Sequence, residues 1–200
     1  MIDTDGMEAL TIGRLAKDMG VRPMALYTHF RDKEAIVKAA AAEIFGRFEV
    51  PEPATSDLES LRKILHAYFR LLIDNPVLLQ LYEAGEDVTP AAAHFSEAIF
   101  GRLLGLGLDH RAVVGWATTL VRFVIGSAFV YPTRRTWEND SGYFERTRLR
   151  LAALPTDTYP AIHELTRNYP TFTQQESFEF GLGALLAALG AITNAPADSA

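Results

Sequence analysis

The chain of 200 residues is 48% hydrophobic, which allows one or two packed domains and excludes an intrinsically disordered protein. It contains no cysteine, which excludes a disulfide framework, a zinc–thiolate site and a cysteine nucleophile, and this fits a cytoplasmic location. Its net charge of −6 argues against a surface that is basic all over. The longest apolar stretch, around 112–130, is interrupted by Arg122, and no apolar leader opens the chain, so we expect neither a membrane span nor a signal peptide.

Charge is distributed unevenly along the chain. Between Leu10 and Lys38 the formal charge is +3, which leaves −9 for the remainder. The basic residues of this segment are Arg14, Lys17, Arg22, Arg31, Lys33 and Lys38, and the acidic ones are Asp18, Asp32 and Glu34. A basic patch on an acidic body suits a protein of which one end contacts nucleic-acid phosphates.

Caps and turn residues divide the first fifty residues into short helices. Thr11 can cap a helix that Gly20 ends, and Gly20 supplies the positive φ of a tight turn. Pro23 suits the first turn of the next helix, and Asp32 can cap a helix that runs to about Phe48. The segment 50–53, with two prolines, interrupts this pattern. We therefore predict a domain boundary there, between residues 1–49 and 54–192.

The second part also carries helix signals. Capping-box spacing at Ser56 and Thr173 predicts helices that begin there, and Asn75-Pro76 and Thr89-Pro90 each predict another start. Asp109 opens a long apolar helix that closes at Pro132, followed by a loop to residue 142 and one or two helices within 143–168. No stretch alternates with a period of two, so the predicted fold class is all-α.

The run ALYTHFRDKEAIV at 25–37 follows the helix and turn of 10–21. It resembles the recognition helix and the start of the next helix in the TetR family of repressors. This resemblance implies an N-terminal helix-turn-helix DNA-binding domain and a C-terminal helical bundle for effector binding and dimerisation. It also implies a homodimeric transcriptional repressor that binds double-stranded operator DNA and is released by a small molecule.

The outer side of the implied recognition helix carries side chains that suit a major groove. Arg22 suits a bidentate contact to guanine, and Met24 or Ala25 suits a thymine methyl group. Tyr27 and His29 can donate to phosphate oxygens, and Lys33 stands at the start of the next helix, a suitable phosphate site. We predict DNA contacts from Thr11, Arg22, Met24, Tyr27, Thr28, His29 and Lys33. Without the resemblance, the alternative is a small helical subdomain with a solvated charged face.

Two features depart from the family pattern. Nearly all of the family's first helix, which normally precedes Ile2, is absent, so we expect either a start upstream of Met1 or a loosely held DNA reader. Gly13 stands where many relatives have a polar or basic side chain that can reach DNA. These departures keep open an alternative, a helical small-molecule-binding or protein-interaction module that has lost DNA binding.

Two helices, at 109–131 and 174–190, are apolar on nearly all sides. The second opens with Phe178-Glu179-Phe180-Gly181-Leu182, which resembles the last helix of repressors with a tetracycline-repressor type of C-terminal domain. A helix that is apolar all round must be covered all round. We therefore predict a homodimer through these two helices, with a helix buried inside one subunit as the alternative.

The resemblance places the effector among the helices at 57–74, 76–83, 90–106 and 109–131. The predicted ligand-binding residues are Phe69, Tyr82, Phe95, Trp116, Thr119, Arg122 and Phe123, which imply a hydrophobic or aromatic ligand. Arg122 is either a counter-ion for an acidic ligand or a partner in an ion pair across the interface. The positions that hold the magnesium-chelated drug in the tetracycline repressor are largely apolar here, so we expect no metal and no cofactor.

An enzyme is the competing class of protein. The five histidines are scattered, and His94 with Glu97 is a single pair that lacks the second set a di-metal bundle requires. Gly105-Leu106-Gly107 and Gly181-Leu182-Gly183 lie in or beside helices without a preceding strand, which is not the context of a phosphate-binding loop. We therefore expect no catalytic residues.

Overall fold

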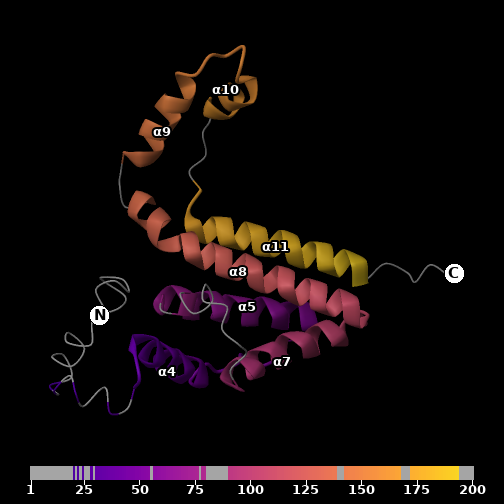
Figure 1. The fold of residues 1–200 in the computed structure, drawn as a ribbon. Coiled ribbons are helices and arrows are strands. Elements are labelled where there is room, and N and C mark those ends of the chain that lie inside the picture. The colour runs from indigo at the N-terminus through magenta and orange to yellow at the C-terminus, as the bar shows by residue number, and fades with distance from the viewer. Residues whose placement is uncertain are drawn as a thin grey trace, which may run out of the picture.

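The computed structural model describes residues 20, 22, 24, 28, 30–54, 56–76, 78–79, 90–138, 142–167 and 172–193. All regular structure within these residues is helical, which confirms the predicted fold class. The helices, labelled as in Figure 1, are α4 (Lys33–Gly46), α5 (Asp57–Asp74), α7 (Pro90–Gly105), α8 (His110–Glu138), α9 (Tyr143–Ala152), α10 (Pro160–Thr166) and α11 (Gln174–Thr193).

The caps expected from the sequence begin three of these helices. The Asp32 carboxylate accepts a hydrogen bond of 2.8 Å from the backbone of the third helical residue, and α4 starts directly after it. Ser56 Oγ accepts from the backbone of Glu59 at 3.3 Å at the start of α5. Before α11, Thr173 and Glu176 exchange hydrogen bonds of 2.8 and 3.1 Å in a reciprocal capping box. Local side chains thus define where these helices start.

The end of α8 differs from the prediction. The sequence indicates a loop over 131–142, but α8 continues through Pro132 to Glu138, so this prediction is wrong. Proline removes one backbone donor from a helix, whereas a helix that is already nucleated gains one hydrogen bond with each further residue. Propagation of the long helix therefore overrides the proline. The two helices expected within 143–168 are α9 and α10.

Helix α5 packs against α7, α8 and α11 and supplies the centre of the core. One face of α5 carries apolar side chains at helical spacing, and it meets Leu120 and Val124 of α8 and Leu182 of α11. The buried residues of α5 are Ser60, Leu61, Ile64, Leu65, Tyr68, Phe69 and Leu72. Each large apolar side chain buried in this way contributes about 1.5–3 kcal/mol.

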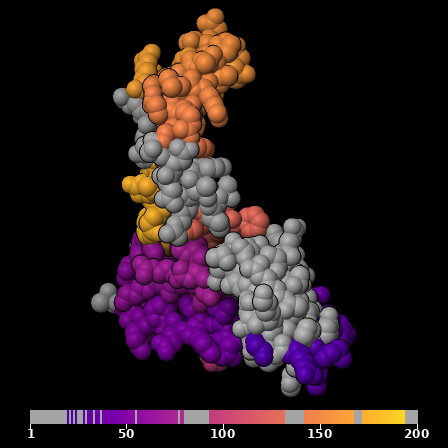
Figure 2. Space-filling view, turned by 90° about the vertical axis from the view of Figure 1, so that its left-hand side faces the viewer, coloured from indigo at the N-terminus to yellow at the C-terminus, as the bar shows by residue number. Residues whose placement is uncertain are grey.

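The other helices extend from this core in two directions. Helix α4, which follows the N-terminal region, packs against α7. Helices α9 and α10 pack against each other and stand away from the bundle (Figures 1 and 2). The turn between these two helices is closed by His163, whose Nε2–H donates to the carbonyl oxygen of Leu154 at 2.6 Å.

Helices α8 and α11 lie side by side and retain exposed apolar surface (Figure 1). By length and composition, His110–Tyr131 and Gln174–Thr193 are both apolar enough to cross a membrane. Only 33% of the most apolar stretch of the first and 28% of that of the second are buried. The large hydrophobic side chains that they expose are Val114, Phe129, Val130, Phe180 and Ile192. This surface requires cover that the described part of one chain does not supply.

Candidate functional site

The predicted DNA contacts fall only partly within the described residues. Arg22 and Thr28 are exposed, Met24 is 74% exposed, and the Thr28 hydroxyl donates to the carbonyl of Met24 at 3.0 Å. Gly20 has a φ of +68°, which confirms the positive value predicted for the turn. Thr11, Tyr27, His29 and the side chain of Lys33 lie outside the described residues. The three described side chains are thus accessible, as a DNA contact requires.

The start of α4 is held electrostatically. The backbone N–H of Ala35 and the guanidinium of Arg31, 3.1 Å away, hydrogen-bond to the Asp32 carboxylate and keep its pKa below the ordinary value. The carboxylate therefore stays charged at neutral pH and interacts favourably with the positive, N-terminal end of the helix dipole. This fixes the first turn of the helix that connects the predicted DNA reader to the bundle.

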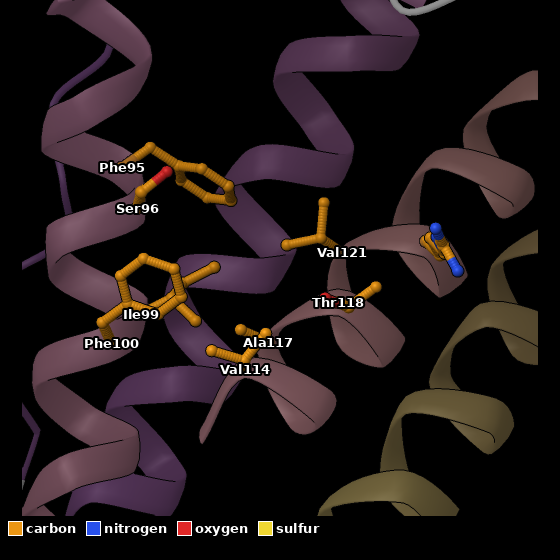
Figure 3. Close-up of a pocket in the computed structure, with 9 residues that line it drawn as sticks. Phe95, Ser96, Ile99, Phe100, Val114, Ala117, Thr118 and Val121 are labelled. Atoms are coloured by element: carbon orange, nitrogen blue, oxygen red, sulfur yellow. The ribbon is translucent and has the colours of Figure 1, made fainter. Parts of the chain in front are cut away.

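A groove of about 240 Å³ lies between α7 and α8 (Figure 3). Its buried residues are Phe95, Ile99 and Ala117, all less than 7% exposed. The remaining lining residues are Ser96 and Phe100 of α7 and Val114, Thr118, Val121 and Arg122 of α8. The walls are mainly apolar side chains. Their polar groups are the hydroxyls of Ser96 and Thr118 and the guanidinium of Arg122. Such a groove suits an apolar small molecule.

Helical periodicity brings the two walls together. Residues 95, 96, 99 and 100 share one side of α7, and residues 114, 117, 118 and 121 share one side of α8. The connection turns sharply at Gly107, where φ is +78°, and Asp109 then caps α8 by accepting from the backbone of Ala112 at 2.8 Å. Asp57 of α5 lies 3.5 Å from the guanidinium of Arg102, which ties α7 to the core near this turn.

Of the seven residues predicted to bind a ligand, the structure places Phe95 and Arg122 in this groove. Phe69 is buried elsewhere and stacks on Phe178 with ring centroids 3.9 Å apart. Phe123 also stacks on Phe178, with ring centroids 5.7 Å apart. Phe69 is therefore a core aromatic in this structure, whereas Phe123 is half-buried and lies outside the α7–α8 groove.

The other three predicted ligand residues also lie apart from the groove or cannot be placed. Trp116 packs, half-buried, against the core, and the Thr119 hydroxyl donates to the carbonyl of Gly115 at 2.8 Å. Tyr82 lies outside the described residues. The lining residues that sequence reasoning missed are Ser96, Ile99, Phe100, Val114, Ala117, Thr118 and Val121. Their spacing of three and four residues was an available signal, but it does not say which helix each face meets.

Phe95 connects the groove to the start of the bundle. Its ring centroid lies 4.2 Å from that of Tyr68 and 6.0 Å from that of Phe48, which follows α4. Phe45, in the last turn of α4, lies 6.3 Å from Tyr68. A ring that lines the groove therefore belongs to a continuous aromatic cluster that reaches the helix from the N-terminal region. A shift of Phe95 would be transmitted to this helix because packed interiors leave little free space.

A second, shallower groove of about 350 Å³ runs between α8 and α11. It is lined by Arg122, Phe123, Gly126, Ser127, Val130, Gln174 and Ser177, so Arg122 lies at the edge of both grooves. Gln174 donates to the carbonyl of Ser127 at 3.2 Å across this second groove. Among the described residues, no three metal-ligating side chains gather at either groove or elsewhere.

Comparisons with known sequences match both parts of the chain. The family model "Bacterial regulatory proteins, tetR family" matches residues 1–40, and the model "Tetracyclin repressor-like, C-terminal domain" matches residues 50–192. An HTH-type transcriptional regulator of Saccharopolyspora erythraea is 26% identical over 196 residues, which are 96% of this chain and 80% of that relative.

Solved structures show the same fold. The Streptomyces coelicolor TetR family protein ActR in complex with (S)-DNPA gives a TM-score of 0.76 at 21% identity, covering 96% of this chain and 93% of that one. ActR in complex with actinorhodin gives 0.77 at 20% identity, covering 96% and 92%. Both likenesses extend over nearly the whole chain, and at this identity they establish the architecture.

Proposed function

Because the chain belongs to the TetR family of bacterial regulatory proteins, we propose that it is a cytoplasmic repressor that binds operator DNA as a homodimer. In this proposal a small hydrophobic or aromatic effector binds the α7–α8 groove and releases the DNA. The observation that carries it is the position of Phe95, which lines the groove and also contacts Tyr68 and Phe48. One ring thereby joins a ligand-sized groove to the helix that leads to the DNA reader.

The accessible side chains of the N-terminal region support the DNA part of this proposal. Arg22, Met24 and Thr28 face solvent, and the segment around them is basic within an acidic chain. We propose that DNA contacts come from Thr11, Arg22, Met24, Tyr27, Thr28, His29 and Lys33. Arg22→Ala should cost about 1–3 kcal/mol on the operator and relax base preference, whereas Lys33→Ala should weaken binding on all sequences.

The exposed apolar surface of α8 and α11 supports the homodimer. Phe180 is 73% exposed and Phe129 is 55% exposed, although both helices are apolar enough to form a core. A second copy of the same two helices would cover this surface by a self-complementary contact. The two DNA readers of such a dimer must meet successive major grooves about 34–36 Å apart.

Release follows from the cluster of Phe95, Tyr68 and Phe48. A ligand that fills the groove presses on Phe95, and α4 must then change its angle to the bundle, which alters the spacing of the two readers. The two arrangements need differ by only a few kcal/mol, provided that the ligand favours the unbound state by that much. Linkage is reciprocal, so DNA must weaken ligand binding by the same factor.

The experiment is selection of an operator from random DNA with the full chain, followed by release with a panel of aromatic compounds. We then measure ligand affinity with and without operator. An operator that leaves ligand affinity unchanged would contradict induction. Failure to enrich any DNA, with ligand binding intact, would favour a helical small-molecule-binding module without DNA binding.

A coupling variant sharpens this test. Phe48→Ala removes a ring that contacts Phe95 but does not line the groove, so ligand affinity should change little while the ligand's effect on DNA binding falls. Tyr159→Ala, at an exposed aromatic position before α10 that lines neither groove, is the matched control. If Phe48→Ala leaves the ligand effect at its original size, the proposed path through Phe95 is refuted.

A further inference from the structure

We propose that the effector of the α7–α8 groove is an acid, with a flat apolar body between the helices and a carboxylate held by Arg122. This inference deepens the proposed function and rests on it for the role of the groove. The chemistry of the site itself comes from the residues that line it. Arg122 is thereby assigned as the residue that determines specificity for charged over neutral ligands.

Arg122 is the charged side chain of the groove. The other residues that line it are two phenylalanines, four aliphatic residues and two residues with hydroxyl groups, Ser96 and Thr118. Arg122 has no ion pair or hydrogen bond to any residue that the structure describes. Some other arginines are matched within the chain, such as Arg47 with Glu43 at 2.7 Å and Arg148 with Glu145 at 2.6 Å. The groove therefore carries, beside apolar side chains, a positive charge without a partner among the described residues.

The two carboxylates of α11, which could otherwise match Arg122 across a dimer interface, are already engaged. Glu176 closes the capping box with Thr173, and Glu179 lies 3.1 Å from Nε2 of His66. These are the two carboxylates of α11, and Glu138, at the C-terminal end of α8, is the one carboxylate of that helix. An ion pair between copies through either carboxylate of α11 would have to break one of these contacts. A ligand carboxylate requires no such loss.

The geometry of the groove fits the two parts of the proposed ligand. The rings of Phe95 and Phe100 stand on the α7 side, opposite Val114, Ala117 and Val121 of α8 (Figure 3), which leaves a slot with apolar walls. A planar guanidinium matches a carboxylate through two parallel hydrogen bonds. The apolar walls hold the flat body of the ligand and so position its carboxylate beside the guanidinium. The site should therefore discriminate by charge as well as by shape.

The test uses two probes of nearly equal shape, 1-naphthylacetate and 1-naphthylacetamide, titrated calorimetrically into the full chain. We expect the acid to bind about tenfold more tightly than the amide, a difference of about 1.4 kcal/mol. The preference should shrink at high salt because an exposed charge is screened. Arg122→Gln should abolish the preference and leave the affinity for the amide unchanged, whereas Arg122→Lys should keep part of it.

Two variants locate the effect. Arg111→Gln removes an exposed arginine of the same helix that does not line the groove, and it should keep the full preference. Thr118→Trp places a large ring in the groove and should weaken both probes. Probes that bind this variant as tightly as the original chain occupy another site, and that result would overturn the proposal.

Other outcomes would also overturn it. These are equal affinity for acid and amide, absence of binding by both at millimolar concentration, or an acid preference that survives Arg122→Gln. Arg122→Gln that splits the dimer while the preference persists would instead identify an interface ion pair. The measurements use no DNA, so an acid preference that depends on Arg122 would stand even if no operator is found.

Discussion

Helices α5 and α11 are similar in length, and both bury a face in the same core, yet their outer faces differ. The outer face of α5 is polar, with Lys63 and Arg70 exposed, as expected of a helix on the surface of a folded subunit. The outer face of α11 exposes Phe180 and Ile192, and neighbouring α8 exposes Phe129. Packing within one chain accounts for where α5 is polar and where it is apolar. It does not account for the exposed apolar side chains of α8 and α11.

This difference separates two functions of apolar side chains. Those of α5 stabilise the subunit, and those on the outer side of α8 and α11 are proposed to hold two subunits together. Substitutions on the two surfaces should therefore change different measured quantities, the free energy of unfolding in one case and the dissociation constant of the dimer in the other.

The largest effect is expected from Phe180→Glu. It places a charge on the surface proposed to be buried between copies, and each dimer contains it twice, so dimerisation should weaken by about 4 kcal/mol or more. Sedimentation at micromolar concentration should then show a monomer that is still helical. Lys63→Glu, on the outer face of α5, is the control and should remain dimeric. A dimer that survives Phe180→Glu would place the interface elsewhere.

Leu185 of α11 is a less suitable site for a charge that tests dimerisation. Its side chain packs half-buried against the core of its own subunit, so Leu185→Glu should also lower the stability of the subunit. Phe180 separates dimerisation from folding more cleanly because it is exposed in the single chain.

A smaller effect is expected from Leu61→Ala on the buried face of α5. Leu61 is fully buried in the core, and truncation of such a side chain costs about 2–5 kcal/mol, because a cavity remains. Urea unfolding at several protein concentrations should show a loss that does not depend on concentration. A loss that disappears at high concentration would mean that α5 also contributes to the interface.

Gly181→Ala tests the contact between α8 and α11. A Cβ at Gly181 would lie 2.5 Å from the Phe123 ring, so the helices must move apart or the ring must turn, at a cost of about 1–3 kcal/mol. The matched control is Gly101→Ala in α7, where a Cβ meets nothing within 4 Å and better helix propensity should stabilise by about 0.5–1 kcal/mol. Equal thermal shifts for the two variants would contradict the close approach at Gly181.

The smallest effect concerns how the stability of the fold declines at acid pH. Hydrogen bonds from the backbone and hydroxyl of Thr173 lower the pKa of Glu176 below its ordinary value. A group with a lowered folded-state pKa stabilises above its unfolded pKa, and this contribution is lost as pH falls through the folded value. Glu176→Gln should therefore lower the melting temperature at neutral pH and flatten its decline in acid. Glu97→Gln, at an exposed position on α7, should leave the acid decline unchanged.

Local signals predicted much of the fold. Asp32, Ser56 and Thr173 were identifiable as caps because each acts on backbone groups within three residues. Gly20 was identifiable because a tight turn demands a φ that other residues avoid. The extension of α8 past Pro132 was not predictable from a rule about single residues, since it depends on the length of the helix that precedes the proline.

The groove could be predicted only in part. Phe69 and Phe95 are both aromatic residues on inward faces, and periodicity treats them alike. The structure stacks Phe69 on Phe178 from a third helix, whereas Phe95 borders an open space between α7 and α8. This distinction depends on how the helices are rotated against one another, which a single sequence does not encode locally. Arg122 was identifiable because a charge in an apolar helix stands out wherever the helix packs.

The position of Phe95 also bears on how such a regulator changes in evolution. Phe95 belongs to the cluster that reaches α4, whereas Phe100, Val114 and Thr118 line the groove at exposed positions. Mutations at these rim positions can alter which molecule is sensed while the response machinery is inherited intact. A lineage could thus acquire new inducers in single steps, and a biosensor could be retuned at the same three positions.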